Sequence, residues 1–132
     1  MIDKNALIAE RILGWRLATT PDQRYGRWIP PSLTGPIDGP DMVEINMVEI
    51  KDAGSTCPKF DKDPRASEAL IDAIVKQHHM NVSMVSSYAD NGKDRIVCRI
   101  WNPDGGRSWN LIRENRQEAL VEAAGLAFRL WQ

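Results

Sequence analysis

The feature that most constrains the fold is a run of start and stop signals along residues 63–132. Asp63-Pro64 opens a helix, because an aspartate caps the first free amide groups and a proline fits the first helical position. Asn91-Gly92 lies between two β-rich runs, which is the strongest short-range signal for a hairpin. With a further turn at residues 103–106, these signals predict the order helix, hairpin, third strand, helix.

The boundaries of these elements follow from the same pattern. The first of the two helices is predicted to close near His79, and its apolar stripe consists of Leu70, Ile71, Ile74, Val75 and His78. The predicted strands span residues 81–88, 95–102 and 107–112. Asn115 and Glu118 have the spacing of a capping box and open the last helix, whose small residues allow close approach to a neighbour.

The hairpin register can be deduced from the turn. A two-residue turn at Asn91-Gly92 pairs Asp90 with Lys93, and side chains then alternate between the two faces of both strands. One face is predicted to carry Val82, Met84, Ser86 and Tyr88 with Arg95, Val97, Arg99 and Trp101. The other face is predicted to carry Ser83, Val85 and Ser87 with Ile96, Cys98 and Ile100. Because both faces hold apolar groups, we expect an α+β fold in which helices cover both sides of a small antiparallel sheet.

The first half of the chain contains one clear helix. Residues 3–13 are predicted to be helical, with Asp3 as the N-cap and Gly14 ending the helix in a left-handed turn. Residues 15–17 and 27–29 are expected to be short extended pieces.

Residues 32–57 have a different character and are interpreted as a Pro/Gly-rich arm. The tetrapeptide MVEI occurs twice in it, at residues 42–45 and 47–50. An offset of five residues changes sides in a strand, so the two copies cannot present one face together. We interpret the stretch as an edge strand or an arm exchanged between subunits. The chain is therefore predicted to be a single domain, with its core in residues 1–31 and 58–132.

The composition excludes several classes of protein. A chain of 132 residues, 42% hydrophobic and 27% charged, is ordinary for a single globular domain. A net charge of −1 argues against binding to extended nucleic acid, which calls for an excess of basic residues. The chain has neither an apolar run of membrane-spanning length nor a signal-peptide pattern. We expect a protein of a reducing cytosol in which Cys57 and Cys98 are free thiols.

Several motifs, taken in order, resemble the phage ABA-sandwich domain family, a group of small proteins of bacteriophages and prophages. They are LIAERILGW at residues 7–15, the Trp28-x-Pro30-Pro31 motif, and Pro58-Lys59-Phe60 followed by Asp63 at a helix start. The resemblance covers most of the chain except residues 32–56. Where relatives commonly have Ser-Thr-Asp after the aromatic residue, this chain keeps only the aromatic and the capping aspartate. The resemblance implies the sandwich fold and a phage origin, and it supplies no catalytic residues.

The sequence contains no familiar catalytic or metal-binding pattern. His78 and His79, the only histidines, diverge by about 100° on a helix and lack a third ligand, so neither a metal nor a cofactor is expected. Cys98 lies mid-strand and is expected to pack as a small hydrophobic residue, and no signature surrounds Cys57. The turn at residues 103–107 joins two strands, whereas phosphate-binding loops lead into a helix. We therefore predict that the protein is not an enzyme.

The candidate binding site is a group of arginine and aromatic residues on and near the hairpin. Arginine binds phosphate through two parallel hydrogen bonds, and a tryptophan or tyrosine stacks a base. The candidate ligand-binding residues are Tyr88, Arg95, Arg99, Trp101, Arg107 and Arg113, with Arg116 nearby in sequence. The sequence more simply supports the other interpretation, in which Trp101 packs under a helix while the arginines pair with surface carboxylates.

Three functional hypotheses follow. The first, by association with phage proteins, is a counter-defence protein that sequesters a small nucleotide immune signal, cyclic or linear, at a boundary between identical subunits. The alternative is a module that binds and inhibits a host or phage protein, because aromatic residues with arginine also mark protein interfaces. A nucleotide hydrolase ranks last, since no acid–base pair or metal set is visible.

Overall fold

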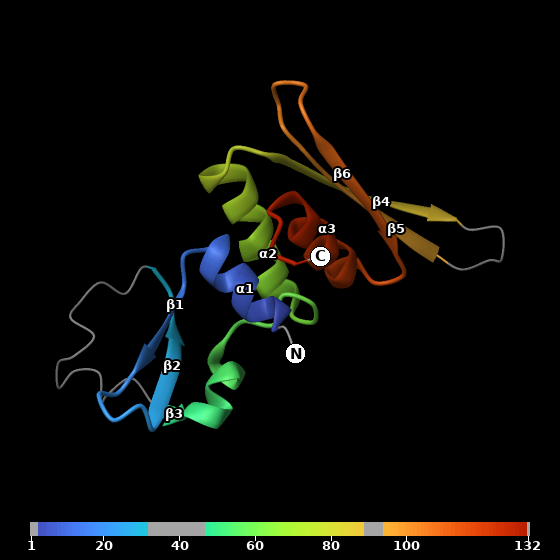
Figure 1. Ribbon diagram of the computed structural model, residues 1–132. Coiled ribbons are helices and arrows are strands. Elements are labelled where there is room, and N and C mark those ends of the chain that lie inside the picture. Colours follow the sequence, from blue (N-terminus) through green and yellow to red (C-terminus); the bar gives the residue numbers. More distant parts are fainter. Residues whose placement is uncertain (1–2, 32–46, 89–93, 132) are drawn as a thin grey trace.

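The computed structural model describes residues 3–31, 47–88 and 94–131, with the side chains of residues 87, 88 and 94 excepted. The described chain has an α+β fold with two small antiparallel sheets, ordered β1-β2-β3 and β4-β5-β6. The two sheets lie at opposite ends of the molecule, and helices α1, α2 and α3 lie between them (Figure 1). The main hydrophobic core is formed by these helices and one face of the β4-β5-β6 sheet.

The three helices begin where the sequence predicts. The side chain of Asp3 caps α1 (Lys4–Arg11), and that of Asp63 caps α2 (Pro64–Asp72). The side chain of Asn115 accepts a hydrogen bond of 3.0 Å from the Glu118 amide at the start of α3 (Arg116–Ala127). Gly14 has a φ of 78°, and the amide after it, that of Trp15, donates to the Ala9 carbonyl. The predicted caps and the left-handed turn after α1 are therefore confirmed.

The predicted stripe of the second helix is wrong at one position. Leu70 and Ile74 are fully buried, but Val75 is 41% exposed. After α2 the chain continues as a π-helical turn, η3 (Ala73–Gln77), in which the His78 amide bonds to the Ala73 carbonyl. A π turn contains more residues than an α turn, so it shifts the helical phase and carries Val75 out of the buried stripe.

The first sheet confirms the two short extended pieces and shortens the predicted arm. Strand β1 (Arg16–Thr19) pairs with β2 (Tyr25–Ile29), which pairs in turn with β3 (Val48–Glu49). A 3-10 helix, η2 (Ile50–Thr56), follows β3, and its Thr56 hydroxyl accepts a hydrogen bond of 2.8 Å from the Trp28 amide. Ala53 and Cys57 are buried. Residues 47–57 of the predicted arm thus belong to the packed fold, whereas residues 32–46 lie outside the described residues.

The second sheet consists of β4 (Asn81–Tyr88), β5 (Asp94–Trp101) and β6 (Ser108–Arg113). The predicted register of its hairpin is wrong by one residue. Val82 lies opposite Ile100, Met84 opposite Cys98, and Tyr88 opposite Asp94, whereas the predicted Asn91-Gly92 turn itself lies outside the described residues. The observed register places apolar Val82 and Met84 on the same face as fully buried Cys98 and Ile100. A slip of one residue exchanges the two faces of a strand, and burial of this apolar set outweighs the preference of the Asn-Gly turn.

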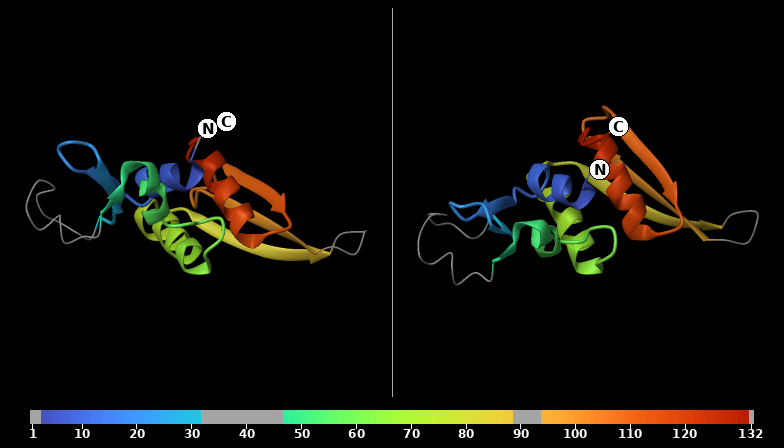
Figure 2. Two further views of the ribbon diagram at one scale, coloured as in Figure 1. Left: turned by 90° about the horizontal axis from the view of Figure 1, so that it is seen from below. Right: turned by 60° about the horizontal axis from the view of Figure 1, so that its bottom comes forward.

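Only one face of this sheet carries helices in the part of the chain that the structure describes. Helix α3 packs on β5 and β6, and the core face carries Trp109 and Leu111 from β6. Figure 2 shows α2 and α3 on the same side of the sheet in both views. The expectation of helices on both faces is therefore not met by the described residues. The strands themselves run as predicted to within a residue.

Candidate binding face on the second sheet

The face of the β4-β5-β6 sheet that points away from α3 is here called the open face. Its members alternate with the core residues along each strand and are, in strand order, Asn81, Ser83, Val85, Arg95, Val97, Arg99, Trp101, Ser108, Asn110 and Ile112. None of these ten is a carboxylate, and two are arginines. The open face is therefore basic, although the chain as a whole has a net charge of −1.

An apolar row crosses the middle of the open face. Val85 of β4 lies opposite Val97 of β5, which lies opposite Ile112 of β6. Val85 is 58% exposed and Ile112 is 50% exposed. A partner that covered these β-branched side chains would gain roughly 25 cal/mol of binding free energy for each Å² of apolar surface removed from water. A contiguous apolar row of this kind marks a surface for association more than single scattered apolar residues do.

Arg99 and Trp101 form a preorganised pair beside this row. The Arg99 guanidinium carbon lies 4.6 Å from the centroid of the Trp101 ring, a cation–π stack along one edge of the face. Arg99 is exposed and Trp101 is half-buried. Stacking fixes the plane of the guanidinium and leaves its N–H groups in that plane, where they can bind a carboxylate or phosphate.

The structure brings together three of the six predicted site residues. Arg95, Arg99 and Trp101 share the open face. Arg113 pairs with Ile96 on the core face, and its Nη1 donates to the Ile112 carbonyl at 2.8 Å. Arg107 is exposed in the turn before β6. The backbone of Tyr88 pairs with Asp94, but its side chain lies outside the described residues.

The predicted pairing of these arginines with surface carboxylates is not seen between described residues. The ion pairs among them join Lys4 to Glu122, Arg24 to Asp22, Lys51 to Glu49 and Lys76 to Asp72. Arg95, Arg99 and Arg107 take part in none of these pairs. The charge of the open face is therefore not neutralised by the described part of the chain.

The sequence reasoning missed Val85 and Ile112, because it assigned Val85 to the opposite face from Arg99. The available signal was the match of Val82 and Met84 to Ile96, Cys98 and Ile100, which completes one apolar face. The Asn-Gly dipeptide predicts the other register. Of the five tryptophans, Trp15, Trp28, Trp109 and Trp131 pack against the main core, and Trp101 alone lies on the open face.

Both thiols lack the character of a nucleophile. Cys98 is fully buried and Cys57 is 3% exposed. Burial raises the pKa of each thiol to about 11, against a small lowering by Arg116 at Cys98. Since the thiolate is the reactive form, neither group is activated at neutral pH. The prediction that Cys98 packs as a small hydrophobic residue is confirmed.

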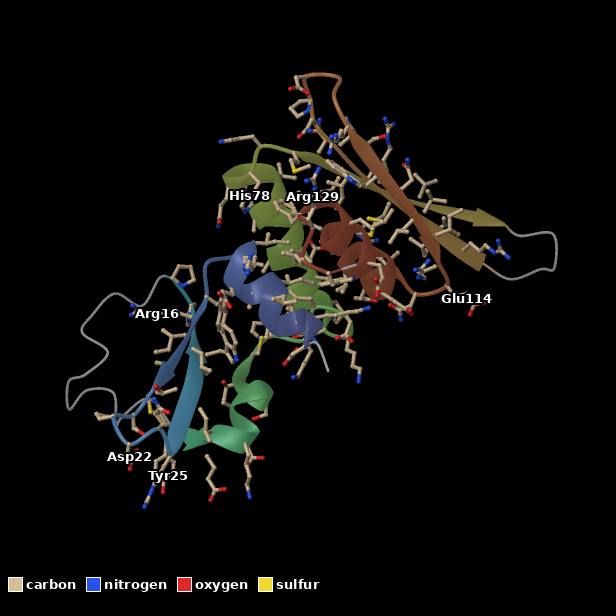
Figure 3. All side chains as sticks on the ribbon, viewed as in Figure 1. Arg16, Asp22, Tyr25, His78, Glu114 and Arg129 are labelled. Carbon is tan, nitrogen blue, oxygen red and sulfur yellow. The ribbon has the colours of Figure 1, made fainter. Side chains whose placement is uncertain are left out.

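His78 packs within the fold, whereas His79 is exposed. His78 Nε2 lies 2.8 Å from the Ile12 carbonyl oxygen, and the ring meets Phe128 edge-on at a centroid distance of 4.8 Å. Figure 3 labels His78 at the end of the α2–η3 helix, close to Arg129 of the C-terminal segment. Within the described residues no cluster of three or more His, Cys, Asp or Glu side chains could hold a metal ion.

A concave surface lies at the far end of the molecule, beside β2 and β3. It encloses about 370 Å³ and is lined by Gln23, Arg24, Tyr25, Glu49, Ile50 and Lys51. Figure 3 shows Tyr25 and Asp22 projecting from the end of this sheet. Lys51 pairs with Glu49 at 3.2 Å and Arg24 with Asp22 at 3.9 Å, so its cations already have carboxylate partners.

Comparison with protein-family models, with curated proteins and with solved structures found no match for this chain. Among the described residues, no helix has both the length and the apolar character that crossing a membrane requires.

Proposed function

We propose that this protein is a non-enzymatic interaction module that binds another protein through the open face of its second sheet. The observation that carries the proposal is the apolar row, with Val85 and Ile112 at least half exposed in the centre of a basic sheet face that no described helix covers. A bound partner would cover this row and supply the second layer of the predicted sandwich. Protein interfaces combine an apolar centre with arginine and aromatic residues, which is the composition of this face.

Site-specific cross-linking tests the proposal. A photoreactive phenylalanine analogue at position 85 is expected to give a discrete adduct in bacterial cells, and the same analogue at Val75 serves as the control. Val75 is exposed to a comparable degree but lies on η3. The adducted protein, identified by mass spectrometry and purified, should bind the wild-type chain and fail to bind Val85→Asp. Equal labelling from both positions, or unchanged binding by Val85→Asp, would contradict the proposal.

Capture of a small nucleotide is the second candidate, and the Arg99–Trp101 stack favours it. The guanidinium already covers one face of the indole, so that face is not available to stack a base. The N–H groups at the edge of the guanidinium remain available to bind a phosphate. In its full form this candidate is a cytoplasmic phage counter-defence protein that assembles into oligomers and sequesters a nucleotide signal between subunits.

A ligand-release experiment tests the nucleotide candidate. Purified protein is incubated with cyclic and linear nucleotides, washed, and heated, and the released material is analysed by chromatography. Intact ligand that is absent from the Arg99→Ala protein supports sequestration, whereas chemically altered ligand indicates an enzyme. Recovery of nothing from the wild-type chain contradicts the candidate. Sedimentation velocity with and without ligand tests the assembly.

A further inference from the structure

The two arginines of the open face, Arg95 and Arg99, lie at a definite spacing along β5. Arg95, Val97 and Arg99 occupy alternate positions of the central strand β5, so the two cations flank the apolar row. Four residues of extended strand place the bases of the two arginine side chains about 14 Å apart. Within the described residues neither arginine has an ion-pair partner, and Arg99 is held in place by Trp101. The face therefore presents cation, apolar group and cation in one line.

An extended chain has the matching geometry. Its residues i, i+2 and i+4 point to one side and span the same length of about 14 Å. A helix matches poorly, because a rise of about 14 Å takes nine residues at 1.5 Å each, and residue i+9 points to the opposite side of a helix. Two β-structures that pack face to face keep their strands nearly aligned, so one extended segment can follow β5 over this distance.

The charge pattern selects among possible occupants. A second copy of this face would oppose arginine with arginine, because the ten residues of the open face include no carboxylate. A nucleic-acid strand would place sugar and phosphate over Val85, Val97 and Ile112, and the net charge of −1 gives such binding no general support. A protein segment with carboxylates on both sides of an apolar side chain matches each of the three positions.

We propose that the open face recognises an extended segment of a partner protein with the pattern acidic-x-apolar-x-acidic. The two carboxylates bind Arg95 and Arg99, and the apolar side chain packs on the row formed by Val85, Val97 and Ile112. This inference rests on the proposed protein-binding function and names the chemistry of the partner.

Cyclised hairpin peptides provide the probe. One strand of a fluorescein-labelled peptide carries Glu-Thr-Val-Thr-Glu, a second peptide carries Gln-Thr-Val-Thr-Gln, and a third carries Glu-Val-Thr-Thr-Glu. The third has the composition of the first, but its valine faces the other side. Fluorescence anisotropy is expected to show binding of the first peptide that is about tenfold or more weaker for the other two. That ratio is the lower end of what hydrogen bonds to charged groups contribute, which the second peptide loses, and of what burial of a valine side chain contributes, which the third peptide loses.

Variants of the protein complete the experiment. Arg95→Ala and Arg99→Ala should each weaken binding of the first peptide about tenfold or more. Arg65→Ala removes an exposed arginine of α2, away from the open face, and should leave binding unchanged. Circular dichroism establishes that each variant is folded. Equal affinity for the first and third peptides, or no effect of either open-face arginine, overturns the inference.

The outcomes separate this inference from the proposed function. A cross-linked partner at position 85 together with no binding of the first peptide means that the face binds protein through another chemistry. Selective peptide binding without any cross-linked partner means that the recognition chemistry is correct and the proposed function is wrong. Wild-type self-association that Val85→Asp abolishes identifies a second copy as the occupant and also overturns the inference.

Discussion

Among the described glycines, Gly125 has the least room for an added side chain. It is buried inside α3, and a Cβ placed on it would overlap Cζ2 of Trp131, which folds back over the helix. The Leu130 amide donates to the Gly125 carbonyl at 3.0 Å and holds this return of the chain. The missing side chain is therefore the reason that the C-terminal tryptophan can cover α3.

We predict that Gly125→Ala destabilises the protein by about 1–3 kcal/mol, as overpacking does in well-packed cores. Helix propensity alone would give the opposite sign, since alanine is favoured over glycine within a helix by about 1 kcal/mol. Urea denaturation measures the difference. Gly54→Ala is the control, because its Cβ would meet only Asp3 Oδ2 at an ordinary distance of 3.8 Å. Stabilisation by Gly125→Ala would show that Trp131 does not occupy this position.

Cys98 is predicted to lower the stability of the protein at alkaline pH. Burial raises its thiol pKa from 9.0 to about 11, so the unfolded chain loses this proton at lower pH than the folded chain. The stability that the neutral thiol contributes is fully present below pH 9 and is lost as the pH rises towards 11. The loss is on the order of 2 kcal/mol. Urea denaturation at pH 8 and pH 10.5 should therefore show a smaller decrease for Cys98→Ala than for the wild type.

At the scale of elements, the hairpin register decides which residues face the core. Met84 and Val85 are neighbours on β4, yet Met84 packs against the main core and Val85 is 58% exposed. A carboxylate at position 84 would lie partly buried against the apolar core without a partner, whereas one at position 85 would stay in water beside the arginines of the open face.

Met84→Asp is therefore predicted to cost about 3 kcal/mol or more of stability, because it combines lost apolar burial with an unpaired charge. Val85→Asp should change stability by no more than about 1 kcal/mol, as surface substitutions do. Thermal unfolding of the two proteins compares them directly. In the register with Asp90 opposite Lys93, Met84 and Val85 exchange faces. A larger loss of stability for Val85→Asp than for Met84→Asp would therefore support that register.

At the scale of the whole molecule, the described residues form two hydrophobic clusters of unequal size. The main cluster joins the three helices with the core face of the second sheet, and Lys4 links α1 to Glu122 and to the ring of Trp131. The smaller cluster consists of Ala18, Ile29 and Met47 in the first sheet. Apart from Trp28 of β2, which packs in the main core, little apolar burial holds the first sheet, so it should open without unfolding of the main core.

Hydrogen exchange is expected to show this difference. Amide groups of β1 and β2 should exchange through a local opening at a free energy below that of global unfolding, whereas β5 amides next to Cys98 and Ile100 should exchange only on global unfolding. Native-state exchange in low concentrations of urea distinguishes the two classes by their denaturant dependence. Identical dependence for β1 and β5 would mean that both sheets unfold as one cooperative unit.

Elements with local signals follow from the amino-acid sequence alone. Asp3, Asp63 and Asn115 cap the helices as predicted, and Gly14 forms the predicted left-handed turn after α1, because a cap or turn needs only a neighbouring amide or a permitted backbone angle. The strands of the second sheet also follow from local runs of β-forming residues. Three of the six candidate site residues share a face because alternation along β5 is itself a local property.

The tertiary structure decided what depends on contacts between distant segments. The register of β4 on β5, the exposure of Val75 after the π turn and the packing of residues 47–57 on β2 all depend on burial against elements far away in the chain. Arg113 lies away from Arg99 for the same reason, since β6 adopts the register that buries Trp109 and Leu111 under α3. Burial of apolar surface is non-directional and sums over the whole molecule, so no single window of sequence specifies it.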